Sequence, residues 1–223
     1  MALALFDIDG TLVAGPSTER RFIRWLIARR HLGARQLAAF AGFLLRWGPR
    51  YGAHTLKKNK AYLSGLDAAA VDELARCFVA EEILKVLHAP AANRLREHLT
   101  AGDHVMLLSG TLMPIARALG RSLGVDDVLA TQCVMRAGRY LAVPPAVHPF
   151  GVEKRVLLES IRKRPGCSRE PVYAYADSHH DLALLEAVDV PVCVLPDARL
   201  QACARDRGWL ILEERIELPA TLD

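Results

Sequence analysis

The sequence predicts an α/β protein with a doubly wound parallel sheet and an all-helical insertion after the first strand. Residues Ala2–Phe6 form a short apolar run that ends at two aspartates, which is typical of a buried parallel strand. Strand signals are then absent from Ser17 to about His88. Beyond that point short apolar runs alternate with helical patterns, as they do where helices join parallel strands.

The segment after the first strand carries several helical patterns. Ser17 or Thr18 can cap a first helix, and Asp67 can cap a later one. A helix between them is expected to end at Gly48-Pro49. We therefore expect a core and a helical cap, with the core at residues 1–13 and 89–223 and the cap at residues 14–88.

The composition is that of a globular chain. Of the 223 residues, 52% are hydrophobic and 24% are charged, which argues against extended disorder. The longest apolar stretch, Leu37–Leu45, is too short to span a bilayer, and no signal peptide is apparent. The five cysteines are scattered without a Cys-x-x-Cys pair, so neither zinc nor a disulfide framework is expected. These features favour a cytoplasmic protein with reduced thiols.

Positive charge is concentrated in the predicted cap. From Arg20 to Lys60 there are 11 lysines and arginines and no aspartate or glutamate. Solvated helix faces explain such a run, and so does a positive field that attracts an anionic substrate. No nucleic-acid-binding motif accompanies the charge, so nucleic acid is not an expected partner.

Two aspartates follow the first strand, at Asp7 and Asp9. Ligands of open α/β sheets bind outside the carboxyl ends of the strands. Two carboxylates placed there repel each other, and burial adds to the cost. A divalent cation relieves that cost, and Mg²⁺ suits a small site with one or two carboxylates.

The stretch Asp7-Ile-Asp-Gly-Thr11 resembles motif I of the haloacid dehalogenase (HAD) superfamily of aspartyl-phosphate enzymes. The resemblance implies that Asp7 is the nucleophile that attacks phosphorus. It implies that Asp9 is the general acid and then the general base. A carboxylate nucleophile divides one difficult displacement into two easier ones. The resemblance also implies a Rossmann-like core.

A second buried strand is predicted at Val105–Leu108, and it ends in Ser109-Gly110-Thr111 before a helix at Ile115–Leu123. Glycine allows close backbone approach, and N–H groups at a helix start point at an anion. These residues predict a phosphate cradle formed by Ser109, Gly110 and Thr111. Ser109 resembles motif II of the family, in which the hydroxyl holds phosphate.

The next segments predict a strand at Val128–Met135, a hairpin turn at 136–140, and a helix that opens at Gly151. Gly151-Val-Glu-Lys154 resembles motif III of the family. Lys154 would then neutralise the nucleophile and the transferring phosphoryl group. Arg155 is the alternative residue for this role.

A strand at Pro171–Ala176 leads into Asp177-Ser-His-His-Asp181, which resembles motif IV. The resemblance implies that Asp177 binds the metal and that Asp181 is the second carboxylate. The expected Mg²⁺ ligands are Asp7, Asp9, Asp177 and Asp181. His180 stands where the family commonly has Asn, and it is a candidate donor to phosphate. Further strands are expected at Val190–Leu195 and Trp209–Leu212.

The resemblance is to the HAD subgroup IB that contains phosphoserine phosphatase, and it implies Mg²⁺-dependent hydrolysis of a small phosphorylated metabolite. Phosphoserine phosphatases of this subgroup usually carry a cap glutamate nine residues after the nucleophile, where this chain has Pro16. Glu19 is the nearest acid and a candidate contact for a substrate amine. Phosphoserine and histidinol phosphate both stay open as substrates. The alternatives are a phosphotransferase or mutase on the same core, and a non-enzymatic protein whose basic cap binds an anionic surface. The oligomeric state is not predicted.

Overall fold

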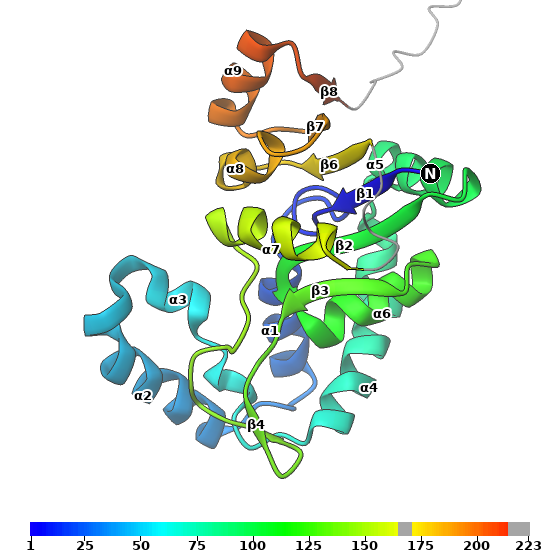
Figure 1. The fold of residues 1–223 in the computed structure, drawn as a ribbon. Coiled ribbons are helices and arrows are strands. Elements are labelled where there is room, and N and C mark those ends of the chain that lie inside the picture. The colour runs from blue at the N-terminus through cyan, green and yellow to red at the C-terminus, as the bar shows by residue number, and fades with distance from the viewer. Residues whose placement is uncertain (165–170, 214–223) are drawn as a thin grey trace, which may run out of the picture.

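The computed structural model describes residues 1–164 and 171–213 (Figure 1). A six-stranded sheet has the order β3-β2-β1-β6-β7-β8, and every neighbouring pair is parallel. The strands are β1 (Leu3–Phe6), β2 (His104–Leu112), β3 (Asp127–Thr131), β6 (Val172–Ala176), β7 (Val190–Val194) and β8 (Leu210–Leu212). The predicted fold class is confirmed.

Helices cover both faces of this sheet. Alternate residues of a strand point to opposite faces, so Ala4 and Phe6 of β1 join one core cluster while Leu3 and Leu5 join another. The first cluster receives α5 (Ala89–Thr100) and α6 (Met113–Leu123). The second receives α7 (Val152–Arg162), α8 (Leu182–Leu185) and α9 (Ala198–Arg207).

The chain between Phe6 and His104, which the structure describes throughout, contains helices and no strand. Short 3₁₀ and π turns link its helices. The α-helices of this segment that precede α5 are α1 (Thr18–Ala28), α2 (Ala34–Tyr51), α3 (Thr55–Lys58) and α4 (Ala68–Phe78). Helix α2 continues through Pro49, contrary to the predicted end at Gly48-Pro49. Pro49 lies in the last turn, where a missing N–H removes one hydrogen bond, and Tyr51 still stacks on Trp47 with the ring centroids 6.0 Å apart.

A hairpin after β3 packs against this helical segment. It consists of β4 (Met135–Arg136) and β5 (Arg139–Tyr140), and the Gly65 and Ala68 N–H groups donate to Tyr140 O at 2.9 Å and Gly138 O at 2.8 Å. The predicted strand at Val128–Met135 is therefore wrong in its length, since β3 ends at Thr131. Thr131 Oγ1 donates to Gly110 O at 2.6 Å, and Gln132 pairs with Val147 instead of continuing the sheet.

None of the helices in the described ranges is long and apolar enough to cross a membrane.

Replacing two helical glycines with alanine should change the stability of the protein in opposite directions. A Cβ at Gly120 would lie 2.6 Å from Val125 O and 3.0 Å from Val128 Cγ2, whereas a Cβ at Gly42 would meet nothing within 4 Å. We expect Gly120→Ala to lower the free energy of unfolding by about 1–3 kcal/mol because the packing cannot give way. Gly42→Ala should raise it by about 0.5–1 kcal/mol. Urea unfolding followed by circular dichroism measures both, and equal effects would contradict the packing of α6.

Candidate functional site

A cavity of about 330 Å³ lies where β1, β2 and β6 end, and parts of the helical segment and of the loop before α7 close over it. Parallel strands bring their carboxyl ends to one edge, so residues far apart in sequence meet there. The cavity is lined by Asp7, Asp9, Ser17, Glu19, Lys57, Lys60, Ser109, Gly110, His148, Phe150, Lys154, Asp177, Ser178, His180 and Asp181.

Lys154 is the buried cation of the site. Its side chain is 3% exposed, and Nζ lies 2.9 Å from Asp7 Oδ1 and 2.7 Å from Asp181 Oδ2. Gly151, at φ 61°, precedes α7 and puts Lys154 in its first turn. Burial lowers the pKa of this ammonium, but the charges of Asp181 and Asp7 outweigh burial and hold its pKa above the ordinary value. Lys154 therefore remains charged beside both carboxylates.

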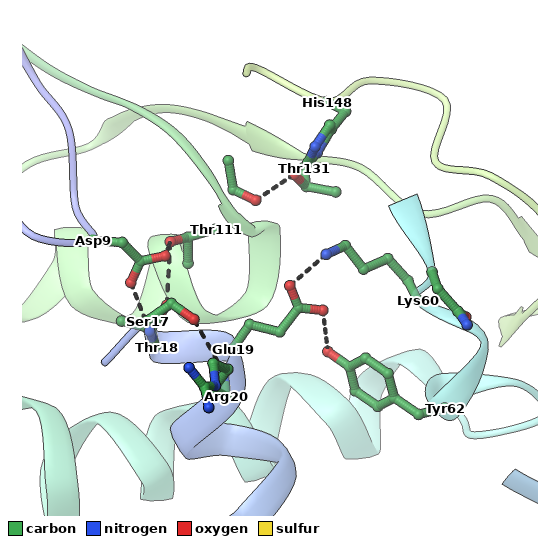
Figure 2. A network of polar contacts seen from close by, with 12 residues as sticks. Asp9, Ser17, Thr18, Glu19, Arg20, Lys60, Tyr62, Thr111, Thr131 and His148 are labelled. Carbon is green, nitrogen blue, oxygen red and sulfur yellow. Dashed lines mark hydrogen bonds and ion pairs between the residues drawn. The ribbon is translucent and has the colours of Figure 1, made fainter. Parts of the chain in front are cut away.

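Asp9 is held by donors from two different parts of the chain (Figure 2). Thr18 N at the start of α1 donates to its Oδ1 at 2.6 Å, and Thr111 Oγ1 on β2 donates to its Oδ2 at 2.9 Å. Burial raises the pKa of Asp9, and the nearby charge of Asp7 adds to that, although the hydrogen bond from Thr18 opposes them. Asp9 can therefore hold a proton at a higher pH than an ordinary aspartic acid.

Asp177 lines the same cavity, and little positive charge balances its carboxylate. Thr11 Oγ1 donates to its Oδ1 at 3.3 Å, and no lysine or arginine in the described chain forms an ion pair with it. Burial, then the charges of Asp7 and Asp181, raise its pKa to about 7. Gly10, at φ 85°, makes room for it, since a Cβ there would lie 2.0 Å from Asp177 Oδ2.

These contacts define which residues fit a metal ion. Asp177 has no ion-pair partner among the described residues, and the nearby charge of Asp7 helps to raise its pKa. These two carboxylates suit Mg²⁺, which takes one or two carboxylates and keeps several waters. The predicted set of four carboxylate ligands stays a prediction. Asp181 is engaged by Lys154, Asp9 is engaged by Thr18 and Thr111, and the described residues contain no group of three or more His, Cys, Asp or Glu that could hold a metal.

Two of the three residues predicted to bind phosphate lie in the cavity wall. Ser109 and Gly110 line the cavity, and Thr111 N donates to Ser109 Oγ at 3.3 Å. Thr111 was expected to bind phosphate, but its hydroxyl is directed to Asp9 and it does not line the cavity. Strand β2 continues through these residues to Leu112, and the Ser109 and Thr111 side chains, two residues apart, lie on the same side of it, with Ser109 Oγ 3.3 Å from Thr111 Oγ1.

Glu19 lies in the cavity wall, and its carboxylate is already paired. Lys60 Nζ contacts Oε2, and Tyr62 donates to Oε1 at 2.8 Å (Figure 2). The Lys60 side chain is only 3% exposed, so the pair is shielded from solvent. A substrate ammonium group that contacted Glu19 would share the carboxylate with Lys60.

Motifs alone did not identify several residues of the cavity wall. Lys57 and Lys60 belong to the basic run, which carries no spacing that separates a lining residue from a solvated one. His148 and Phe150 follow the hairpin, and His148 Nδ1 lies 2.8 Å from Thr131 Oγ1. Lys57 Nζ lies 3.8 Å from the centre of the Phe150 ring, and His180, predicted from its motif, lies with its ring 4.8 Å from the same ring. Arg155, the alternative to Lys154, does not line the cavity.

Comparison with known proteins shows the family of this chain. The family described as haloacid dehalogenase-like hydrolase matches residues 4–186. The chain belongs to this family. The phosphoserine phosphatase SerB1 of Mycobacterium tuberculosis is 31% identical to it over 96% of this chain and 71% of the relative. The histidinol-phosphatase of Neisseria meningitidis is 27% identical over 94% of this chain and 97% of the relative.

Solved structures show the same haloacid dehalogenase-like fold. A protein of unknown function from Bordetella pertussis superposes with a TM-score of 0.79 at 26% identity, covering 95% of this chain and 98% of that one. A phosphoserine phosphatase in apo form superposes with a TM-score of 0.63 at 18% identity, covering 96% and 94%. The predicted resemblance is confirmed, and the chain is a haloacid dehalogenase-like phosphatase.

The environment of His148 predicts a pH-dependent stability. Burial and then the charges of Lys60, Lys58 and Lys57 lower its pKa from 6.5 to about 4. Between these pH values the unfolded chain binds a proton that the folded protein does not bind, so the free energy of unfolding falls as pH decreases. We expect wild type to lose on the order of 1–2 kcal/mol relative to His148→Asn over this range.

Urea unfolding at a series of pH values measures this difference. Comparison with the variant isolates His148 from the carboxyl groups, whose raised pKa values act in the opposite direction. His31→Asn, at an exposed site, is the control and should follow wild type. A constant difference between wild type and His148→Asn would contradict the buried neutral imidazole.

Proposed function

We propose that this protein hydrolyses a small phosphomonoester with Mg²⁺, by way of a phosphoryl group carried on Asp7. The observation that carries the proposal is the position of Lys154 between Asp7 and Asp181, beside Asp9 in one cavity. This arrangement supplies a nucleophile, an acid and a buried positive charge within one enclosed space.

In the first step an oxygen of Asp7 attacks phosphorus as the bond to the leaving alcohol breaks. Lys154 holds Asp7 in place and offsets negative charge on the phosphoryl oxygens. Ser109 and the Gly110 backbone lie where they can donate to those oxygens. Mg²⁺ held by Asp7 and Asp177 would supply further charge neutralisation for the phosphoryl group.

Asp9 then serves as acid and base in turn. Its raised pKa lets it hold a proton for the leaving alcohol at a higher pH than an ordinary aspartic acid does. After that transfer Asp9 is a carboxylate, and it can take a proton from the water that attacks the phosphoryl group on Asp7. Thr18 and Thr111 keep its carboxyl group at the cavity wall through both steps.

Phosphoserine and histidinol phosphate are the proposed candidate substrates. Relatives with both names align along nearly the whole chain. Each of these esters carries an amine, which Glu19 could bind beside Lys60. The neighbouring Phe150, His148 and His180 rings offer flat surfaces for an imidazole, while Lys57 and Lys60 offer charge for a carboxylate.

Phosphate release tests the proposal. Purified protein is assayed with phosphoserine, histidinol phosphate, a sugar phosphate and p-nitrophenyl phosphate, each with Mg²⁺ and with EDTA. We expect turnover that requires Mg²⁺ and falls roughly 10³-fold or more in Asp7→Asn, because the nucleophile is lost. Asp206→Asn, at an exposed position of α9, is the control for loss of a carboxylate. Phosphate release that survives in Asp7→Asn would contradict the proposal.

The pH dependence tests the acid. Thr111→Val removes a hydrogen bond that stabilises the ionised form of Asp9, so its pKa rises further and the protonated acid persists to higher pH. We expect the alkaline limb of kcat for an alkyl phosphate to move to higher pH. The value of kcat at neutral pH should change less than about tenfold, because only one hydrogen bond to Asp9 is lost while the bond from Thr18 N remains.

Thr100→Val, whose hydroxyl bonds only within α5 at Arg96 O, is the matched control and should leave the profile unchanged. A Thr111→Val profile that matches wild type would show that Asp9 is not the acid that limits the reaction.

A further inference from the structure

Helix α2 has an outward face that the rest of the described chain leaves uncovered. Leu37 is 72% exposed and Leu45 is 82% exposed, while Phe43 on the opposite side is 2% exposed. A Cβ added at Gly42 would meet no atom within 4 Å. In Figure 1, α2 and α3 lie at the outer edge of the molecule, away from the sheet. No neighbour in this structure therefore accounts for the apolar residues on this face.

The exposed face is a continuous apolar stripe. Its members recur at spacings of three, four and seven, which places them along one side of a helix. The stripe consists of Ala34, Leu37, Ala38, Ala41, Gly42 and Leu45, all of them exposed. Leu56, at the start of the following α3, is 64% exposed. A soluble domain gains nothing in stability from such a stripe, so an exposed one of this length marks a contact surface.

Arginines run along one side of the stripe. Arg35 and Arg46 are separated by eleven residues, which is close to three full turns, and Arg50 follows one turn later. All three are exposed. No acidic residue lies between Arg20 and Lys60, and the carboxylate of Glu19 forms an ion pair with Lys60. Arg46 and Arg50 lie 5.6 Å and 5.8 Å from the ring centres of Trp47 and Tyr51, but the positive charge beside the stripe has no acidic partner within residues 20–60.

We propose that α2 binds an anionic lipid surface, with its apolar stripe entering the headgroup region and its arginines contacting the lipid phosphates. A helix that is apolar on one side and basic on its border suits such a surface. A second copy of this chain fits less well, because two such faces would bring unbalanced arginines together. Nucleic acid would match the arginines but would leave Leu37 and Leu45 in water.

The proposal is independent of the reaction. None of the stripe residues lines the cavity, so binding to a surface leaves the catalytic residues in place. The enzyme would bind at a membrane without entering it, as an interfacial helix does.

Vesicle flotation with the full-length protein tests the proposal. One set of vesicles contains phosphatidylcholine alone, and the other contains equal parts of phosphatidylcholine and phosphatidylglycerol. We expect binding to the second set only, with loss of binding at high salt. Leu45→Glu should weaken binding about tenfold or more, and Arg46→Gln about fivefold. Val156→Glu, at an exposed apolar residue of α7, should bind as wild type does.

Each variant is also assayed for p-nitrophenyl phosphate hydrolysis and for its circular dichroism spectrum, which should match wild type. No flotation with the anionic vesicles, or equal flotation of wild type and Leu45→Glu, would overturn the proposal. It would also be overturned by a dimer in analytical ultracentrifugation that Leu45→Glu dissociates, since a second copy would then cover the face. Tight binding to duplex DNA without vesicle binding would overturn it in favour of nucleic acid.

Discussion

The ion pairs of Lys154 with Asp7 and Asp181 are the constraint on which the site depends. One ammonium group joins the end of β1, the start of α7 and the turn before α8. Charges this deeply buried are stable only when they are paired, and loss of one partner costs about 3–5 kcal/mol. The same contact that links these parts of the core also orients Asp7, which we propose as the nucleophile, so folding and the proposed chemistry depend on one interaction.

The helical segment completes a site that the sheet begins. Thr18 at the start of α1 donates to Asp9, so this carboxyl group is positioned partly by the helical segment. The Glu19–Lys60 pair and Lys57 line the same cavity as Asp7. The hairpin β4–β5 bonds to the same segment through Gly65 and Ala68, and it precedes the loop that supplies His148 and Phe150. The cavity is thus enclosed by three parts of the chain that are distant in sequence.

The sequence predicted the parts of the site that depend on local pattern. A polar residue directly after a buried parallel strand must lie at the carboxyl edge of the sheet, which is why Asp7, Ser109 and Asp177 were found. Local sequence patterns could not predict contacts between elements that are distant in sequence. The Thr111 hydroxyl bonds to Asp9, which is distant from it in sequence. The Glu19–Lys60 pair forms where α1 and the segment after α3 approach each other. The short β3 and the tethered hairpin likewise arise from pairing that no local pattern encodes.

The most direct test of the account is to locate the phosphoryl group on the enzyme. Asp9→Asn removes the base for the second step, and p-nitrophenyl phosphate has a leaving group that needs no acid in the first. Acid-quenched reactions of this variant are digested, and the peptides are analysed by mass spectrometry. The account predicts one added phosphoryl group on Asp7, absent when Asp7 is also replaced by Asn. A phosphoryl group on another residue such as His180, or steady turnover with Asp7 never labelled, would contradict it.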